Sequence, residues 1–269
     1  MSIITIARGS YSRGKEVAER LAQKLGYRCI SREILLEASN QFNIPEMRLV
    51  RALHDAPSVF ERFAHGKDRY ITYIRSTLLK HVQQDNVVYH GLAGHFFLQE
   101  VPHVLKVRII ADLEARVGEE MKRMDISGQE ARYILKKDDE ERRKWGFYLY
   151  GADPWDTSLY DLLINTRSME IEDAVDIIRH TVQRSVFQNT PASQRIIDNL
   201  SLSAQAEAAL VMEFPSVRVV TDEICVHVTI EGPLSLRRHL ASKVHGLLVG
   251  LVRQKEIQVS VVPISVPAT

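Results

Sequence analysis

The chain has 269 residues, of which 45% are hydrophobic and 26% are charged, and its formal net charge is +1. These values are typical of a soluble protein with one large domain or two ordinary ones, and they give no reason to expect nucleic-acid binding driven by bulk charge. The two cysteines, Cys29 and Cys225, form no C-x-x-C motif, which argues against a disulfide framework or a thiolate zinc site.

The start of the sequence carries no basic segment followed by an apolar run and a small-residue cleavage site, so we predict no secretory signal. The longest apolar runs, such as GLLVGLV, are well short of the ~20 residues that a membrane helix needs. We therefore expect a cytoplasmic protein.

The first predicted elements are a strand and a helix joined by a glycine-containing loop. Residues 3–7 (IITIA) form a short β-branched apolar run, which is typical of a buried strand in a parallel sheet. After the loop, Val17, Leu21 and Leu25 recur every four residues and predict the apolar face of a helix, with Gly26 as its C-cap. This order makes half of a βαβ unit.

The loop between these elements has the spacing of a phosphate-binding loop, G-x-x-x-x-G-K. Its two glycines permit backbone angles that let successive N–H groups point into one concavity. The helix dipole points to the same place, where a lysine ammonium group can reach terminal phosphate oxygens. The residues that we assign to the nucleotide phosphates are Gly9, Ser10, Ser12, Arg13, Gly14, Lys15 and Glu16.

The residue after Lys15 departs from the general pattern, which has a Ser or Thr whose hydroxyl holds magnesium. Here the residue is Glu16, which could bind magnesium directly, bind it through water, or face solvent. Ser10 and Ser12 are alternative hydroxyls. The sequence leaves these alternatives open and assigns no side chain as a metal ligand.

Strands and helices then alternate up to residue 188, which predicts an α/β domain with a mostly parallel sheet. The apolar runs predict strands at residues 86–89, 104–111 and 162–165. The intervening segments predict helices at about residues 45–53, 68–84, 113–124, 128–150 and 171–186.

The segment QNTPASQ at 188–194 separates this domain from a different pattern. The expected elements are a helix (about 193–213), two strands (217–221 and 224–230), a helix (236–251) and a strand (257–261). The order α-β-β-α-β predicts a small α+β domain over 193–269.

Several motifs in the first part resemble the cytidylate kinase-like proteins, relatives of the nucleoside monophosphate kinases. They are ITIARGSYSRGKEVAERLAQKLGYRCISREIL, NVVYHGLAGHFFL, KVRIIADLEARV and the stretch from KKDDEERRKW to residue 187. The resemblance implies a P-loop NTPase-type fold with a lid at about 112–150. The segment FPSVRVVTDEICVHVTIEGPLSLRRHL resembles a BON domain, a module linked with binding to membranes, ligands or other proteins.

The first resemblance implies a kinase that uses ATP and Mg²⁺ to phosphorylate a nucleoside monophosphate such as CMP, or another small acceptor. The implied catalytic residues are Lys15, Arg116, Arg142 and Arg143, and the implied acceptor-binding residues are Arg32, His90 and Asp138. Arginines suit a lid because they stabilise charge on the transferred phosphoryl group. The lid segment KKDDEERRKW is also compatible with a solvated helix, since its opposite charges are spaced i,i+4.

Three residues depart from the family pattern: Ser31 and His90 stand where aspartates are common, and Leu92 replaces an arginine. They favour an alternative, a weakly active or inactive nucleotide-binding switch that signals through the C-terminal domain. Lys15 and the lid arginines favour the enzyme. The sequence names neither the acceptor nor a partner for the C-terminal domain, and it is compatible with an oligomer.

Overall fold

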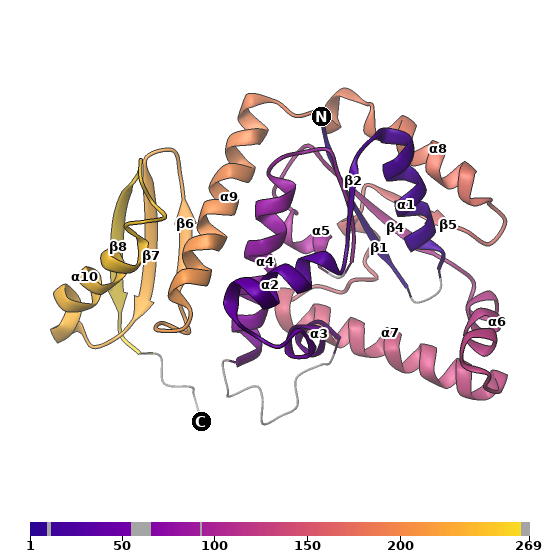
Figure 1. Ribbon diagram of the computed structural model, residues 1–269, viewed down its shortest axis with the longest axis horizontal. Helices are drawn as coiled ribbons and strands as arrows, with labels where there is room; N and C mark the ends of the chain where they lie inside the picture. Colours follow the sequence, from indigo (N-terminus) through magenta and orange to yellow (C-terminus); the bar gives the residue numbers. More distant parts are fainter. Residues whose placement is uncertain (10–11, 55–65, 92, 265–269) are drawn as a thin grey trace.

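Two separate β-sheets organise the chain in the computed structural model (Figure 1), which describes residues 1–9, 12–54, 66–91 and 93–264. A five-stranded sheet lies in the N-terminal part and a three-stranded sheet in the C-terminal part. Within the described ranges, no helix combines the length and the apolarity that a bilayer crossing requires.

The five-stranded sheet is parallel throughout and has the order β2-β3-β1-β4-β5. The strands are β1 (Ile3–Arg8), β2 (Arg28–Ile30), β3 (Val87–His90), β4 (Val104–Ile110) and β5 (Leu162–Asn165). Because β1 pairs with β3 on one side and β4 on the other, the strand order reverses beside β1. Ligands bind at the carboxyl ends of parallel strands at such a switch point. The predicted α/β fold is confirmed.

Helices cover both faces of this sheet (Figure 1). One face packs on α1 and α8 through apolar residues such as Val17, Leu21 and Ile178. The other face packs on α2, α3, α4 and α5, with Ile74 and Leu78 in the core. The bounds are α1 (Gly14–Leu25), α2 (Glu33–Phe42), α3 (Glu46–His54), α4 (Gly66–Val82), α5 (Gly94–Phe97) and α8 (Ile171–Val182).

Helices α6 (Leu113–Met124) and α7 (Gly128–Tyr150) follow each other in the chain and pack together at the carboxyl edge of the sheet, and we call this pair the α6–α7 hairpin (Figure 1). The Asp112 side chain caps α6, and Ser127 and Glu130 form a capping box that starts α7. The hairpin has its own small core, and Trp145 anchors the far end of α7 in the main core. Short 3₁₀ helices follow at η2 (Thr157–Leu159), η3 (Ser185–Phe187) and η4 (Leu234–Leu236).

The C-terminal part has the predicted order α-β-β-α-β. Strand β7 pairs antiparallel with β6 and parallel with β8, and its apolar residues Val226, Val228 and Ile230 face the core. The elements are α9 (Pro191–Leu210), β6 (Arg218–Thr221), β7 (Cys225–Glu231), α10 (Arg237–Leu248) and β8 (Glu256–Val262).

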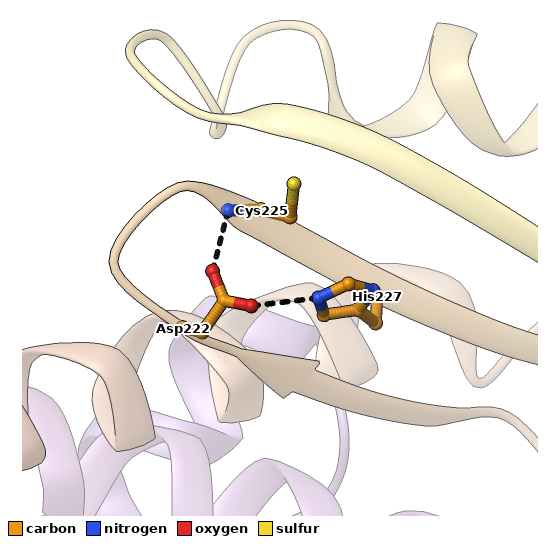
Figure 2. Close-up of side chains that lie close together, drawn as sticks. All are labelled: Asp222, Cys225 and His227. Atoms are coloured by element: carbon orange, nitrogen blue, oxygen red, sulfur yellow. Dashed lines mark hydrogen bonds and ion pairs between the residues drawn. The ribbon is translucent and has the colours of Figure 1, made fainter.

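The turn between β6 and β7 is held by one carboxylate (Figure 2). Asp222 accepts hydrogen bonds from the backbone N–H groups of Ile224 (2.8 Å) and Cys225 (2.7 Å), and its second oxygen lies 2.8 Å from Nε2 of His227. The Cys225 N–H and these other bonds hold the pKa of Asp222 well below its usual range. Asp222, Cys225 and His227 are the one group of three metal-type ligands within the described residues. The Cys225 thiol points away from the carboxylate (Figure 2). We therefore interpret the Asp222 contacts as bonds that hold the turn between β6 and β7.

Helix α9 belongs to both parts of the molecule, since it lies between α4 and β6 (Figure 1). Ile197 and Ala204 are buried in the core of the five-stranded sheet, whereas Ala206 and Leu210 are buried in the core of the three-stranded sheet. The predicted boundary at 188–193 therefore overlaps the start of a helix that both cores share.

One carboxylate of α9, that of Glu207, forms hydrogen bonds to both parts of the molecule. Glu207 accepts a 2.8 Å hydrogen bond from Arg75 of α4 and a 3.0 Å hydrogen bond from the backbone N–H of Val219 in β6. Burial raises the pKa of Glu207, although Arg75 and the Val219 N–H oppose the rise.

Replacing Glu207 with alanine should lower the free energy of unfolding by about 1–3 kcal/mol, because it leaves a guanidinium group and a backbone N–H without their shared acceptor. Urea denaturation measures this loss. Glu213→Ala is the matched control, since Glu213 pairs with Lys243 on the surface. If the two substitutions lowered the free energy of unfolding equally, the proposed stabilising role of Glu207 between the two parts would be contradicted.

Candidate active site

Three adjoining cavities lie at the carboxyl edge of the five-stranded sheet. The loop groove, about 1220 Å³, lies between the β1–α1 loop and the α6–α7 hairpin. The central cavity, about 270 Å³, lies beside Gly9 and Arg116. The side pocket, about 420 Å³, lies between α2, α3 and β3. Arg8 and Arg142 line all three, so the cavities meet at these two side chains.

Two side-chain hydrogen bonds hold the loop after β1, one from within the loop and one from Thr166. Ser12 is buried, its Oγ donates a 3.0 Å hydrogen bond to the Gly9 carbonyl, and Thr166 Oγ1 donates to the Ser12 carbonyl at 3.4 Å. The Ser12 hydroxyl is therefore already engaged inside the loop. Arg13 precedes α1 with φ of 60°, a left-handed conformation that non-glycine residues adopt infrequently. Ser10 lies outside the described residues.

Glycine is required where α1 begins. A Cβ atom at Gly14 would lie 2.8 Å from Cβ of Arg8, which is too close for any other residue without movement of the backbone. This contact lets the first turn of α1 lie directly against the end of β1. The first-turn N–H groups and the positive dipole end of the helix therefore face the loop groove, which favours an anion there.

Lys15 and Glu16 have different surroundings in the loop groove. The Lys15 side chain is 65% exposed, and its Nζ lies 3.6 Å from Glu19. Glu16 lies 3.0 Å from Arg20 and 3.7 Å from Arg13, so its carboxylate makes surface ion pairs in this structure. Of these two side chains, Lys15 has the greater freedom to turn towards a ligand.

The predicted lid arginines separate into two groups. Arg116 is buried and donates two hydrogen bonds to Asp139, at 2.8 and 3.0 Å. It lines the central cavity, as Arg142 does. Arg143 instead binds Asp153 at 2.6 Å and lies over the Trp155 ring, and it is not among the described residues that line the three cavities.

The predicted acceptor residues lie in three different places. Arg32 lines the side pocket, where its Nε donates a 2.7 Å hydrogen bond to Glu46 of α3. Asp138 of α7 lines the loop groove and not the side pocket. His90 ends β3 and is buried; burial, together with the nearby charge of Arg8, lowers its pKa to about 4. His90 is not among the described residues lining the cavities, and Leu92 lies outside the described residues.

A polar network that the sequence analysis missed lines the central cavity. The Tyr160 hydroxyl donates to the Pro154 carbonyl at 2.9 Å and lies 3.2 Å from Nε2 of His95. Arg108 lies over the Tyr160 ring and also bonds the Pro154 carbonyl. Burial and the charge of Arg108 lower the pKa of His95 to about 3, so its imidazole is neutral at pH 7.

Because the pKa of His95 is lowered, we predict that the free energy of unfolding decreases in acid. Below its ordinary pKa of 6.5, His95 takes up a proton in the unfolded chain but not in the folded one, so the free energy of unfolding falls with pH. Between about pH 7 and pH 5, the wild-type protein should lose about 2 kcal/mol more than His95→Gln, which cannot titrate. Denaturation curves at both pH values measure the difference. The exposed His239→Gln should behave like the wild type, and a similar loss in all three proteins would refute the assignment.

Arg8 is the most informative residue that the sequence analysis missed. Arg8 ends β1 and directly precedes the first loop glycine. This position in the sequence could have identified it as a site residue. The last residue of a strand before a phosphate-binding loop lies at the carboxyl edge of the sheet, where ligands bind.

Comparison with known proteins adds an independent result. Residues 3–168 match the cytidylate kinase-like family. A cytidylate kinase from Archaeoglobus fulgidus is 29% identical over 185 residues, which cover 67% of this chain and 94% of that protein. One from Sulfolobus acidocaldarius is 28% identical over 169 residues, covering 62% and 87%. A crystal structure of an uncharacterized protein from Eubacterium ventriosum superimposes with a TM-score of 0.52 at 20% identity, covering 68% of this chain and 100% of that one. That likeness shows the fold.

Proposed function

Because this chain belongs to the cytidylate kinase-like family, we propose that it transfers the γ-phosphoryl group of ATP to a nucleoside monophosphate, with CMP as the first candidate. The observation that carries this proposal is the meeting of the loop groove and the side pocket at Arg8 and Arg142. A donor held in the groove and an acceptor held in the pocket would present their phosphates to the same two guanidinium groups.

The loop groove suits the triphosphate of ATP. The N-terminal N–H groups of α1 and the helix dipole favour its negative charge, and exposed Lys15 can contact the β- and γ-phosphates as a point charge. Glycine at positions 9 and 14 lets the backbone approach the phosphates closely.

The carboxylates of the loop groove fit a magnesium ion, which prefers oxygen ligands and usually binds through one or two carboxylates together with phosphates and waters. Four of the carboxylates that line the groove, those of Glu16, Glu19, Glu114 and Glu119, form ion pairs. Asp138 is the lining carboxylate without an ion-pair partner among the described residues. We therefore assign it to the ion, with or without a bridging water. When bound, magnesium would neutralise phosphate charge.

The side pocket suits the acceptor. Arg32, Arg8 and Arg142 line it with positive charge, while Leu35, Met47 and Val50 supply apolar surface for a base. The Arg32–Glu46 bond would fix the guanidinium group for a phosphate or a base edge.

The transfer step then needs positioning and charge stabilisation more than a general base, since the nucleophile is already an ionised phosphate oxygen. Arg8 and Arg142 would bind the equatorial oxygens, and Arg116 would add charge beside Gly9. The α6–α7 hairpin, which carries Arg116 and Arg142, would exclude water as it closes over the loop.

We also propose that the C-terminal part is a BON-like regulatory module. Helix α9 contributes residues to both cores. A ligand or protein that bound the module and shifted α9 would therefore also shift the packing of the kinase-like part. The same helix supports the second candidate function, a nucleotide-binding switch in which binding rather than turnover carries the signal.

Measurement of ADP formation from ATP and Mg²⁺ with CMP, UMP, AMP, GMP and dCMP tests the kinase proposal. We expect acceptor-dependent turnover, and Arg32→Ala should raise KM for the acceptor by about tenfold with a smaller change in kcat. Arg28→Ala is the control, because Arg28 binds the His81 carbonyl away from the pocket. ATP binding without turnover for any acceptor would reject the kinase and favour the switch.

A further inference from the structure

A fourth cavity, about 420 Å³, lies where the C-terminal end of α9 meets the N-terminal part of the molecule. We call it the junction pocket. Its volume is within the range of small-molecule sites. From α9 and the residues after it come Ala208, Ala209 and Met212, and the opposite wall comes from α2, α3, α4 and the segment between α2 and α3.

The described lining of the junction pocket carries positive charge. Arg48 of α3 and Arg69 of α4 line it, and no Asp or Glu is among the described residues that do so. Both guanidinium groups lie against Tyr70: Arg48 Nη1 is 3.5 Å from its hydroxyl, and Arg69 lies 5.4 Å from the centre of its ring. Among the described residues, neither arginine has a carboxylate partner: Arg48 bonds the Tyr70 hydroxyl and Arg69 contacts the Met212 sulfur.

Two further observations point to an anion. The Nε atom of Arg69 is buried without a hydrogen-bond partner among the described residues, and an unsatisfied buried donor is costly. Burial by itself would raise the pKa of Tyr70, but hydrogen bonds from Arg48 and Arg69 outweigh it and lower the pKa. The surroundings of the Tyr70 hydroxyl therefore stabilise negative charge.

Three aromatic side chains also line the junction pocket: Phe42, Tyr70 and Tyr73. The rings of Phe42 and buried Tyr73 stack with centroids 4.1 Å apart, and half-buried Tyr70, one turn earlier on α4, packs in the same cluster. Flat aromatic walls bind planar rings by stacking, and guanidinium groups bind phosphates. A ligand that carries both groups would use both parts of this pocket.

We propose that the junction pocket binds a mononucleotide as an effector, with its phosphate on Arg48 and Arg69 and its base against the aromatic wall. This site is separate from the loop groove and the side pocket and goes beyond the kinase function proposed above. The position of the junction pocket also connects it to the acceptor site. Helix α3 carries Arg48 on the junction pocket and Met47 and Val50 on the side pocket, so a bound effector contacts a wall of the acceptor site.

Calorimetric titration of the full-length protein with AMP, CMP, GMP, UMP and inorganic phosphate tests the proposal. Arg48→Ala removes one charge from the pocket, and Ala209→Trp fills its volume from an exposed position of α9 without changing charge. Arg253→Ala is the control, since this exposed arginine is remote from the pocket in sequence and removes the same charge.

We expect at least one nucleotide to show two classes of site in the wild type and in Arg253→Ala. In Arg48→Ala and Ala209→Trp, one class should weaken by about tenfold or more. Identical isotherms for all four proteins with every nucleotide would overturn the proposal. It would also be overturned if Ala209→Trp bound like the wild type, or if inorganic phosphate bound as tightly as the nucleotides.

Discussion

Lys15→Ala should lower kcat for phosphoryl transfer by roughly 10²–10³-fold, because it removes a positive charge that would contact the transferring phosphate. The side chain is exposed, and among the described residues its ion pair is with Glu19 on the surface, so the substitution should leave the stability of the fold nearly unchanged. Steady-state kinetics with the best acceptor, together with a denaturation curve, measure both effects.

Lys24→Ala is the matched control for this substitution. Lys24 lies on the same helix, but at its other end, where it pairs with Glu172 and Asp176 of α8. Its replacement should change kcat by less than about twofold, since a surface pair is worth little. If Lys15→Ala retained wild-type turnover, the loop would not hold the transferred phosphate.

Arg116→Ala should have the second large effect, a fall in kcat of about 10²-fold and a loss of about 1–3 kcal/mol in the free energy of unfolding. The guanidinium group lies close to Gly9, and its two bonds to Asp139 join α6 to α7. Its removal therefore takes charge from the central cavity and leaves a partly buried carboxylate unpaired. Kinetics and urea denaturation of the same protein separate the two consequences.

Asp139→Asn distinguishes a direct role of Arg116 from a positioning role. This variant weakens the ion pair but keeps the guanidinium charge beside the loop. We expect it to reproduce most of the loss of stability and much less of the loss of kcat. Equal losses of kcat in the two variants would mean that Arg116 acts only by holding the hairpin together.

The elements near the loop were predictable because each has a strong local signal. The run IITIA, the two glycines and the four-residue spacing of Val17, Leu21 and Leu25 place β1, the loop and α1 within one residue of their observed bounds. Strand β5 is where the sequence placed it. Helix α9 begins earlier than expected, at Pro191, because Thr190 caps it; a Thr-Pro pair is a start signal that was available in the sequence.

Other features depend on contacts between distant residues. Strand β2 has three residues and exists through its pairing with β3, so no periodicity marks it. Arg142 and Arg143 are adjacent, but one residue turns a helix by about 100°, which directs Arg142 to the cavities and Arg143 to Asp153. Sequence alone cannot orient α7, because Trp145 sets its rotation by packing in the core.

The site residues were only partly predictable for the same reason. Lys15 and Arg32 came from recognisable motifs and line cavities in the structure. The three-dimensional meeting point at Arg8 depends on how the sheet edge, the loop and the hairpin come together. The polar network around Tyr160 joins residues that are 65 positions apart, and no motif links them.

The sharing of α9 between two cores bears on the order of events as the chain leaves the ribosome. The N-terminal sheet is complete once β5 has been synthesised, but its core still lacks Ile197 and Ala204, and Gln83 still lacks Asp198, its partner at 2.7 Å. The nascent kinase-like part must therefore wait for α9 before it can close its last apolar surface. Since the opposite side of α9 needs β6 and β7, the two sheets should complete their folding as one cooperative unit.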